Sequence, residues 1–161
     1  DAEAVATGNA VAMIAYVGNA SDCTNGLAIA LEDVSSNTLS WDNSGSNNGG
    51  KTAAELCSAW NTSKAVTGGT WRLPSAKDWQ NMFIGCGASG TVSDDPSSMS
   101  YSGLASKLST AGGTALQSDY YWSSTEYYPL YAWNLLFDGS NALFSIELED
   151  IDFLVRACLA F

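Results

Sequence analysis

Acidic residues are the first side chains of this chain whose type and spacing could support chemistry. From Asp119 to residue 161, seven acids stand against a single basic residue, Arg156. Paired carboxylates can act as general acid and base, but no two of these acids stand in a recognisable catalytic pattern. The chain contains no His, which removes the commonest general base, His-based triads and the commonest transition-metal ligand. We therefore predict that the protein is not an enzyme. The seven acids are Asp119, Glu126, Asp138, Glu147, Glu149, Asp150 and Asp152.

The cysteines are the second group with possible chemistry. Cys23, Cys57, Cys86 and Cys158 are widely spaced and form no CxxC motif. Structural zinc sites normally use closely spaced Cys or His pairs, so we predict no metal and no cofactor. An even number of cysteines permits two disulfides in three connectivities, and four buried free thiols are the other interpretation. The residues leave this choice open.

Composition limits the class of partner. A chain of 161 residues with 46% hydrophobic and 14% charged residues is typical of one globular domain. The net charge of −11 and only six Lys and Arg residues exclude a basic surface for nucleic acid. No apolar run is long enough to cross a bilayer, so we expect no direct membrane insertion. The chain begins DAEAVATG, with neither Met nor a signal peptide, and we expect a preceding segment to have been removed.

An aromatic stretch raises the question of a binding surface. Residues 121–134 read YWSSTEYYPLYAWN, with six aromatic side chains in fourteen residues. Pro129 removes a backbone donor, so we predict a loop over 127–131 rather than a strand. Exposed Tyr beside small polar residues is typical of a binding surface; the alternative is that these aromatics close a small core under the loop. We assign Tyr121, Trp122 and Trp133 to the core.

The remaining elements position this stretch. Apolar runs predict strands at 11–17 and 27–31, and a short strand at 39–41. Thr52 and Glu55 form a capping box that opens a helix extending to residues 61–64, and Ser75 caps a second helix that ends near Gly85. A short helix is expected at 103–111, followed by strands at 120–122, 132–137, 142–148 and 153–161. This order predicts a single α+β domain over residues 1–161, with an antiparallel sheet, two main helices and long irregular loops.

Three separated pieces resemble a known family when they are taken together. They are WRLPSAKDW at 71–79, YWSSTE at 121–126 and VRACLAF at 155–161. In this order they resemble the C-type-lectin-fold proteins of bacteria and phages, and more closely the major paralogous surface domains that include the variable proteins of diversity-generating retroelements. The resemblance covers essentially the whole chain.

The resemblance implies a fixed scaffold that displays a diversified ligand-binding region, here at about 127–153. In such proteins a retroelement replaces residues at scattered positions near the C-terminus while the scaffold stays constant. The implied ligand-binding positions are Tyr127, Tyr128, Pro129, Leu130, Tyr131, Asn134, Leu136, Asp138, Ser140, Asn141, Leu143, Ser145, Glu147, Glu149, Ile151 and Phe153.

The resemblance also bears on cofactors. The calcium motifs of animal lectins, Glu-Pro-Asn or Gln-Pro-Asp followed by Trp-Asn-Asp, do not occur in this chain. The formylglycine-generating oxidases of the same fold use a cysteine pair near the C-terminus, where this chain has only Cys158. By analogy with animal lectins, Cys57 and Cys158 are implied to form a disulfide. Burying the charge of Arg156 in an apolar strand costs free energy unless the charge is paired. We therefore expect Arg156 to have a structural partner, and we predict that this partner is Glu126.

Three functions follow as hypotheses. The first is a non-enzymatic binding module, exported to a cell surface or carried on a phage particle, whose ligand is a protein or glycan on another cell or surface. The second is a structural or pilus-tip subunit that uses the aromatic patch for subunit contacts. The third is an enzyme that uses carboxylates in a cleft. We favour the first.

Overall fold

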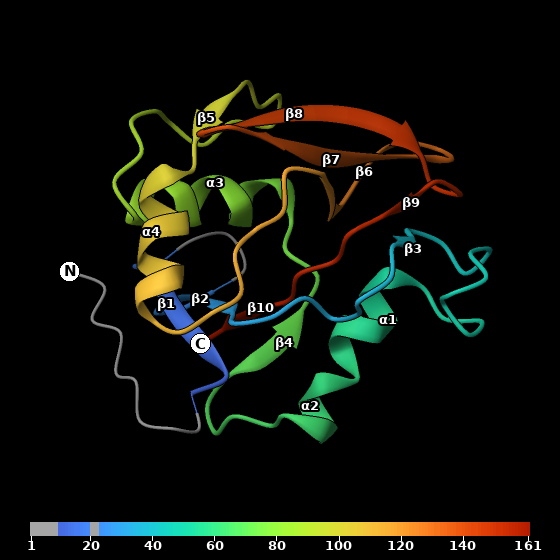
Figure 1. Cartoon of the computed structure of the whole chain (residues 1–161), viewed down its shortest axis with the longest axis horizontal. Coiled ribbons are helices and arrows are strands. Elements are labelled where there is room, and N and C mark those ends of the chain that lie inside the picture. The colour runs from blue at the N-terminus through green and yellow to red at the C-terminus, as the bar shows by residue number, and fades with distance from the viewer. Residues whose placement is uncertain (1–9, 20–22) are drawn as a thin grey trace.

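Strands from both ends of the chain meet in one antiparallel sheet. Figure 1 shows the computed structural model, which describes residues 10–19 and 23–161, so the first nine residues of the predicted domain lie outside it. The sheet has the order β1-β2-β10-β4, and every pairing in it is antiparallel. Its strands are β1 (Ala12–Val17), β2 (Gly26–Ala30), β4 (Thr70–Arg72) and β10 (Cys158–Ala160). The prediction of an α+β protein is confirmed.

A second sheet carries the C-terminal strands, so the prediction of one sheet is wrong. Its order is β5-β8-β7-β6, and β3 (Leu39–Ser40) pairs with β9 (Asp152–Phe153) in a third, two-stranded sheet. The predicted strand 153–161 divides into β9 and β10 because the backbone between them bonds elsewhere: Leu154 N donates to Tyr120 O and Val155 O accepts from Val34 N. The second sheet comprises β5 (Met99–Ser100), β6 (Tyr120–Tyr128), β7 (Tyr131–Asp138) and β8 (Asn141–Leu148).

The helices begin where the capping residues predict. Both Thr52 and Ser75 accept the N3 amide while the N3 carboxylate returns to the cap, which completes two capping boxes. The first predicted helix is broken at Ala59, which ends α1 and begins α2. The helices are α1 (Ala53–Ser58), α2 (Trp60–Ser63), α3 (Ala76–Gly85) and α4 (Ser102–Thr110).

Helix α3 joins the second sheet to the first. Trp79 and Phe83 of α3 pack against Phe137 of β7, with ring centroids 5.7 and 6.2 Å away. Tyr121, Trp122 and Trp133 are buried, as predicted. One face of β7 and β8 therefore packs against the core, and the opposite face points away from α3.

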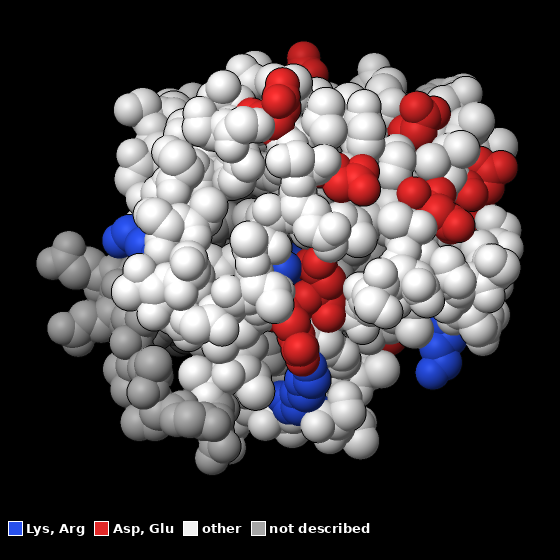
Figure 2. Space-filling view, in the orientation of Figure 1, with Lys and Arg blue, Asp and Glu red and all other residues white. Residues whose placement is uncertain are grey.

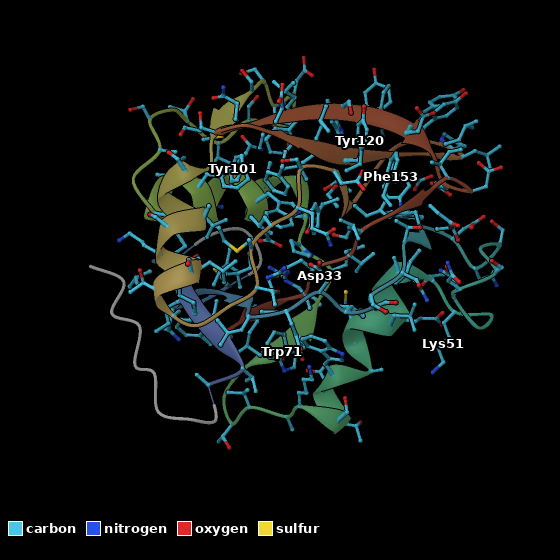
Figure 3. All side chains as sticks on the ribbon, in the orientation of Figure 1. Asp33, Lys51, Trp71, Tyr101, Tyr120 and Phe153 are labelled. Carbon is cyan, nitrogen blue, oxygen red and sulfur yellow. The ribbon has the colours of Figure 1, made fainter. Side chains whose placement is uncertain are left out.

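Arg156 has the structural role that we predicted but a different partner. Its guanidinium is fully buried and forms an ion pair with Asp33, not with Glu126. It also donates to the backbone oxygens of Ala30 and Thr114, each at 3.2 Å. Asp33 follows β2 and lies near the middle of the view in Figure 3, whereas Glu126 lies on the exposed part of β6.

The four cysteines are free and buried, so the implied disulfide between Cys57 and Cys158 is wrong. Burial raises the pKa of the Cys86 thiol to about 11 and that of Cys57 well above its usual range. Burial also raises the pKa of Cys158. Thiols held neutral in this way are poor nucleophiles and poor metal ligands.

This burial predicts the labelling behaviour of the cysteines. Iodoacetamide at neutral pH should modify the native chain hardly at all, because alkylation requires an accessible thiolate. The unfolded chain should take up four labels, and reductant should leave the intact mass unchanged. A mass that increases by two hydrogens on reduction would show a disulfide and contradict this prediction.

Within the described residues, no helix combines the length and the apolar character needed to cross a membrane.

Candidate functional site

Alternate residues of β7 and β8 form a face that points away from α3. Leu135 and Phe137 belong to the core cluster that also contains Trp79 and Phe83 of α3, and Phe144 packs against this cluster. Successive side chains of a strand point to opposite sides, so their neighbours form the other side, which we call the outer face. Three cross-strand pairs of this face are Asn134–Ser145, Leu136–Leu143 and Asp138–Asn141, and Glu147 lies opposite Ala132.

The outer face contains seven of the residues that we predicted for ligand binding. They lie at even positions of β7 and odd positions of β8, so the pairing of the two strands brings them together as neighbours. The seven are Asn134, Leu136, Asp138, Asn141, Leu143, Ser145 and Glu147. Ser140 lies in the turn that joins the two strands.

The aromatic stretch is a β-hairpin, so our prediction of a loop over 127–131 is wrong. Tyr128 pairs with Tyr131, and only Pro129 and Leu130 form the turn. Proline is tolerated here because it stands between the strands and removes no ladder hydrogen bond. We call Tyr127, Tyr128, Pro129, Leu130 and Tyr131 the hairpin tip. All five are exposed, with Tyr128 and Leu130 each 69% accessible to solvent.

Leu130 has a backbone conformation that leucine rarely adopts. Its φ is +74°, and it is the one non-glycine residue with positive φ in the described chain. A turn with proline at its second position and positive φ at its third normally uses glycine at the third. An exposed apolar side chain in a strained turn contributes little to stability, which is typical of positions retained for function.

We expect Leu130→Gly to raise the free energy of unfolding by about 0.5–1 kcal/mol, because glycine adopts positive φ without a Cβ clash. Urea unfolding followed by tryptophan fluorescence measures the change. Tyr128→Gly provides a matched control at an exposed strand position, where glycine should lower the free energy of unfolding. Equal destabilisation by both substitutions would contradict the argument.

Five of the predicted binding residues are buried or half-buried: Asn134, Leu136, Ser145, Glu149 and Phe153. Asn134 is fully buried, and its Oδ1 accepts a hydrogen bond from Ser145 Oγ at 2.6 Å. Phe153 is half-buried because it stacks on Tyr120, with ring centroids 4.8 Å apart (Figure 3). Leu136, which pairs with Tyr120 in the ladder, is also half-buried. The resemblance implied that these residues bind a ligand, but it carries no information on which layers of this chain cover them.

The turn after β8 closes the surface on one side. Glu149 N donates to Leu130 O, and Glu149 O accepts from Trp41 N and Asp42 N. These bonds join the hairpin tip to the loop after β3, with Ile151 exposed beside them. We did not predict that Asp42 lies beside this surface, since nothing in the sequence around Trp41 indicates that this segment contacts residue 149.

Ile146 and Leu148 are also exposed, on the side of β8 opposite the outer face. Alternation placed them with Phe144 on the core face, yet they are 39% and 36% exposed because β8 continues past the residues that pack on α3. Alternation gives the side of a strand but not how far the opposing layer extends.

Glu149 lies among carboxylates. Burial, then the charges of Glu126 and Asp42, raises the pKa of its side chain above the usual 4.5. Its Oε1 atom is enclosed and has no hydrogen-bond partner among the described residues. Within those residues no group of three or more Cys, Asp and Glu has a geometry that would hold a metal ion.

The raised pKa of Glu149 predicts a pH-dependent change in stability. A carboxyl whose pKa is higher in the folded state binds its proton more tightly there, so ionisation costs stability. The cost is absent below the ordinary value of 4.5 and is complete above the raised folded pKa. Glu149→Gln should therefore raise the melting temperature at pH 7 and leave it unchanged near pH 3.5. Exposed Asp95→Asn is the control, and an equal change at both pH values would contradict the assignment.

A separate apolar groove of about 660 Å³ lies beside β1. Its walls come from Val11 and Ile14, from Leu159 and Phe161, and from residues 64–69. The ammonium group of Lys64, the charged residue of this lining, is paired with Glu32 and lies 3.7 Å from the ring centre of Trp60. The groove contains none of the predicted binding residues, and it lacks the convergent polar groups that orient a small ligand.

Comparison of the chain with protein families, with curated proteins and with solved structures finds no match.

Proposed function

We propose that this chain is a non-enzymatic binding module with a C-type-lectin-like fold, of the type that diversity-generating retroelements vary. Its binding surface consists of the hairpin tip, the exposed part of the outer face and the turn after β8. The ligand is a protein, or a glycan, on another cell or surface. The module acts outside the cell, on a cell surface or a phage particle.

The concentration of exposed apolar side chains carries this proposal. Of the twelve large hydrophobic residues exposed in the described chain, eight lie between residues 127 and 151, and six of these belong to the binding surface. Single exposed apolar residues are ordinary, but a group within one surface, mixed with polar residues, is typical of an interaction site. The six are Tyr127, Tyr128, Leu130, Tyr131, Leu143 and Ile151, whereas Ile146 and Leu148 point to the opposite side of β8.

Burial also separates the residues expected to stay constant from those expected to vary. Tyr121, Trp122 and Ser123 of YWSSTE are buried, as are Val155, Arg156 and Ala157 of VRACLAF. Substitution at these positions would damage the core. Exposed positions such as Tyr128 and Leu143 tolerate replacement, because their side chains have few neighbours to lose. The scaffold can therefore remain stable while its surface changes.

Sequencing of the coding segment for residues 115–161 across the source population tests the proposal. We expect substitutions at the exposed positions of 127–153, with 121–126 and 155–157 constant. Substitutions spread evenly along the segment would contradict a diversified binder. A constant surface together with oligomers in solution would instead favour the structural or pilus-tip subunit.

A further inference from the structure

We propose that the ligand of this surface is a protein segment that carries Lys or Arg beside apolar side chains. This inference rests on the proposed function and names the chemistry of the partner. It follows from the carboxylates on and beside the outer face, from the lack of a neutralising cation beside them in the described chain, and from a carboxylate oxygen of Glu149 that has no hydrogen-bond partner among the described residues.

Two carboxylates stand on either side of a small residue on the outer face. Ala132 of β7 pairs with Glu126 of β6 and with Glu147 of β8. Neighbouring strands lie about 4.8 Å apart, so roughly 10 Å separates the two glutamate backbones, with no long side chain from β7 between them. Glu149 is close enough to Glu126 for their charges to interact. Ala132 itself is fully buried, so a cationic head group would meet the exposed Glu126 and Glu147 at this edge of the sheet and would be attracted by Glu149 as well.

The chain does not neutralise these carboxylates itself. Residues 119–155 contain no Lys or Arg, and among the described residues no ion pair involves Glu126, Glu147 or Glu149. Four of the six basic residues pair with other acids. Of the other two, Lys107 lies on α4, and Lys51 lies beside α1 (Figure 3). Figure 2 shows acidic side chains gathered over the end of the molecule where β7, β8 and β9 lie.

A half-buried carboxylate beside this surface lacks a hydrogen-bond donor. Buried polar groups in folded proteins are nearly always hydrogen-bonded, yet Glu149 Oε1 has no partner among the described residues. A carboxylate only accepts, so Glu149 lacks a donor. A basic peptide segment offers N–H donors to this carboxylate.

Charge also argues against a second copy of this chain as the occupant. Two chains of net charge −11 would bring their carboxylates together at this surface, which disfavours association. A basic partner is attracted over long distance instead. The exposed Leu143, Ile151 and Tyr128 provide apolar area for the stems of its Lys and Arg side chains and for its hydrophobic residues.

The test is a selection with a library of random 12-residue peptides displayed on phage. We expect the selected peptides to combine Lys or Arg with apolar residues. Their dissociation constants should rise about tenfold between about 50 and about 500 mM NaCl, because salt screens the charges. Glu147→Gln and Glu126→Gln should each weaken binding of a selected peptide about 3–10-fold. Asp95→Asn, which removes the same charge elsewhere on the surface, should change it less than about twofold.

The other outcomes separate this inference from the proposed function. Selected peptides without Lys or Arg, bound equally by Glu147→Gln, would overturn the basic ligand. If Tyr128→Ser and Leu143→Ser still weakened that binding, the binding surface would stand. Self-association abolished by Leu143→Ser would assign the surface to a second copy and overturn the inference. Circular dichroism of each variant verifies its fold, and peptide binding that no substitution on the surface affects would overturn both proposals.

Discussion

Arg156→Ala should lower the free energy of unfolding by about 3–5 kcal/mol, because it removes one partner of a buried ion pair and leaves the other without compensation. Arg156 is fully buried, and Asp33 is largely so. The substitution also removes the N–H groups that donate hydrogen bonds to the backbone oxygens of Ala30 and Thr114. For a chain of this length we expect the melting temperature to fall by about 6–20 °C, measured by calorimetry.

Two further variants separate the ion pair from the space that it fills. Arg156→Met with Asp33→Leu removes both charges and should be more stable than Arg156→Ala, since no buried charge remains alone. Arg156→Lys keeps the charge but cannot supply all four hydrogen bonds to Asp33, Ala30 and Thr114, so we expect an intermediate loss. Binding by the folded fraction should be unchanged, because Arg156 lies in the core. Loss of binding at full stability would give Arg156 a role in the site instead.

Arg156 also illustrates what the sequence could and could not predict. A charged residue in an apolar segment must have a partner, and this part of the prediction is correct. The identity of the partner depends on contacts across 123 positions of the chain, and no local pattern encodes these. The same limit applies to Asp42 and Glu149, whose segments meet only in the folded chain.

Local patterns predicted the elements well where one physical rule dominates. The capping residues at Thr52 and Ser75 predicted the helix starts, and the strands predicted at 132–137 and 142–148 agree with β7 and β8 to within one residue at each end. The hairpin at Pro129 was missed because proline excludes a strand interior but not a turn between strands. Asn134 was placed on the correct side of β7, and its burial depends on neighbouring layers that alternation does not report.

Trp79→Ala should also lower the free energy of unfolding by about 3–5 kcal/mol. The substitution removes a large, fully buried side chain and leaves a cavity that its neighbours cannot fill. Trp79 packs against Phe83, Tyr121 and Phe137, with ring centroids 5.9, 6.3 and 5.7 Å away. From α3 it therefore contacts both β6 and β7. Urea unfolding followed by far-ultraviolet circular dichroism measures the loss.

The consequences for binding distinguish Trp79 from residues of the surface. Trp79→Phe keeps most of the ring contacts and should cost less than half as much as Trp79→Ala. Because the outer face of β7 is held in place by the packing of its inner face on α3, we expect Trp79→Ala to weaken ligand binding even at temperatures where the chain stays folded. Tyr128→Ser should do the reverse, with binding reduced and stability unchanged, because its side chain is 69% exposed. If Trp79→Ala left both stability and binding unchanged, α3 would not be the support of the binding surface.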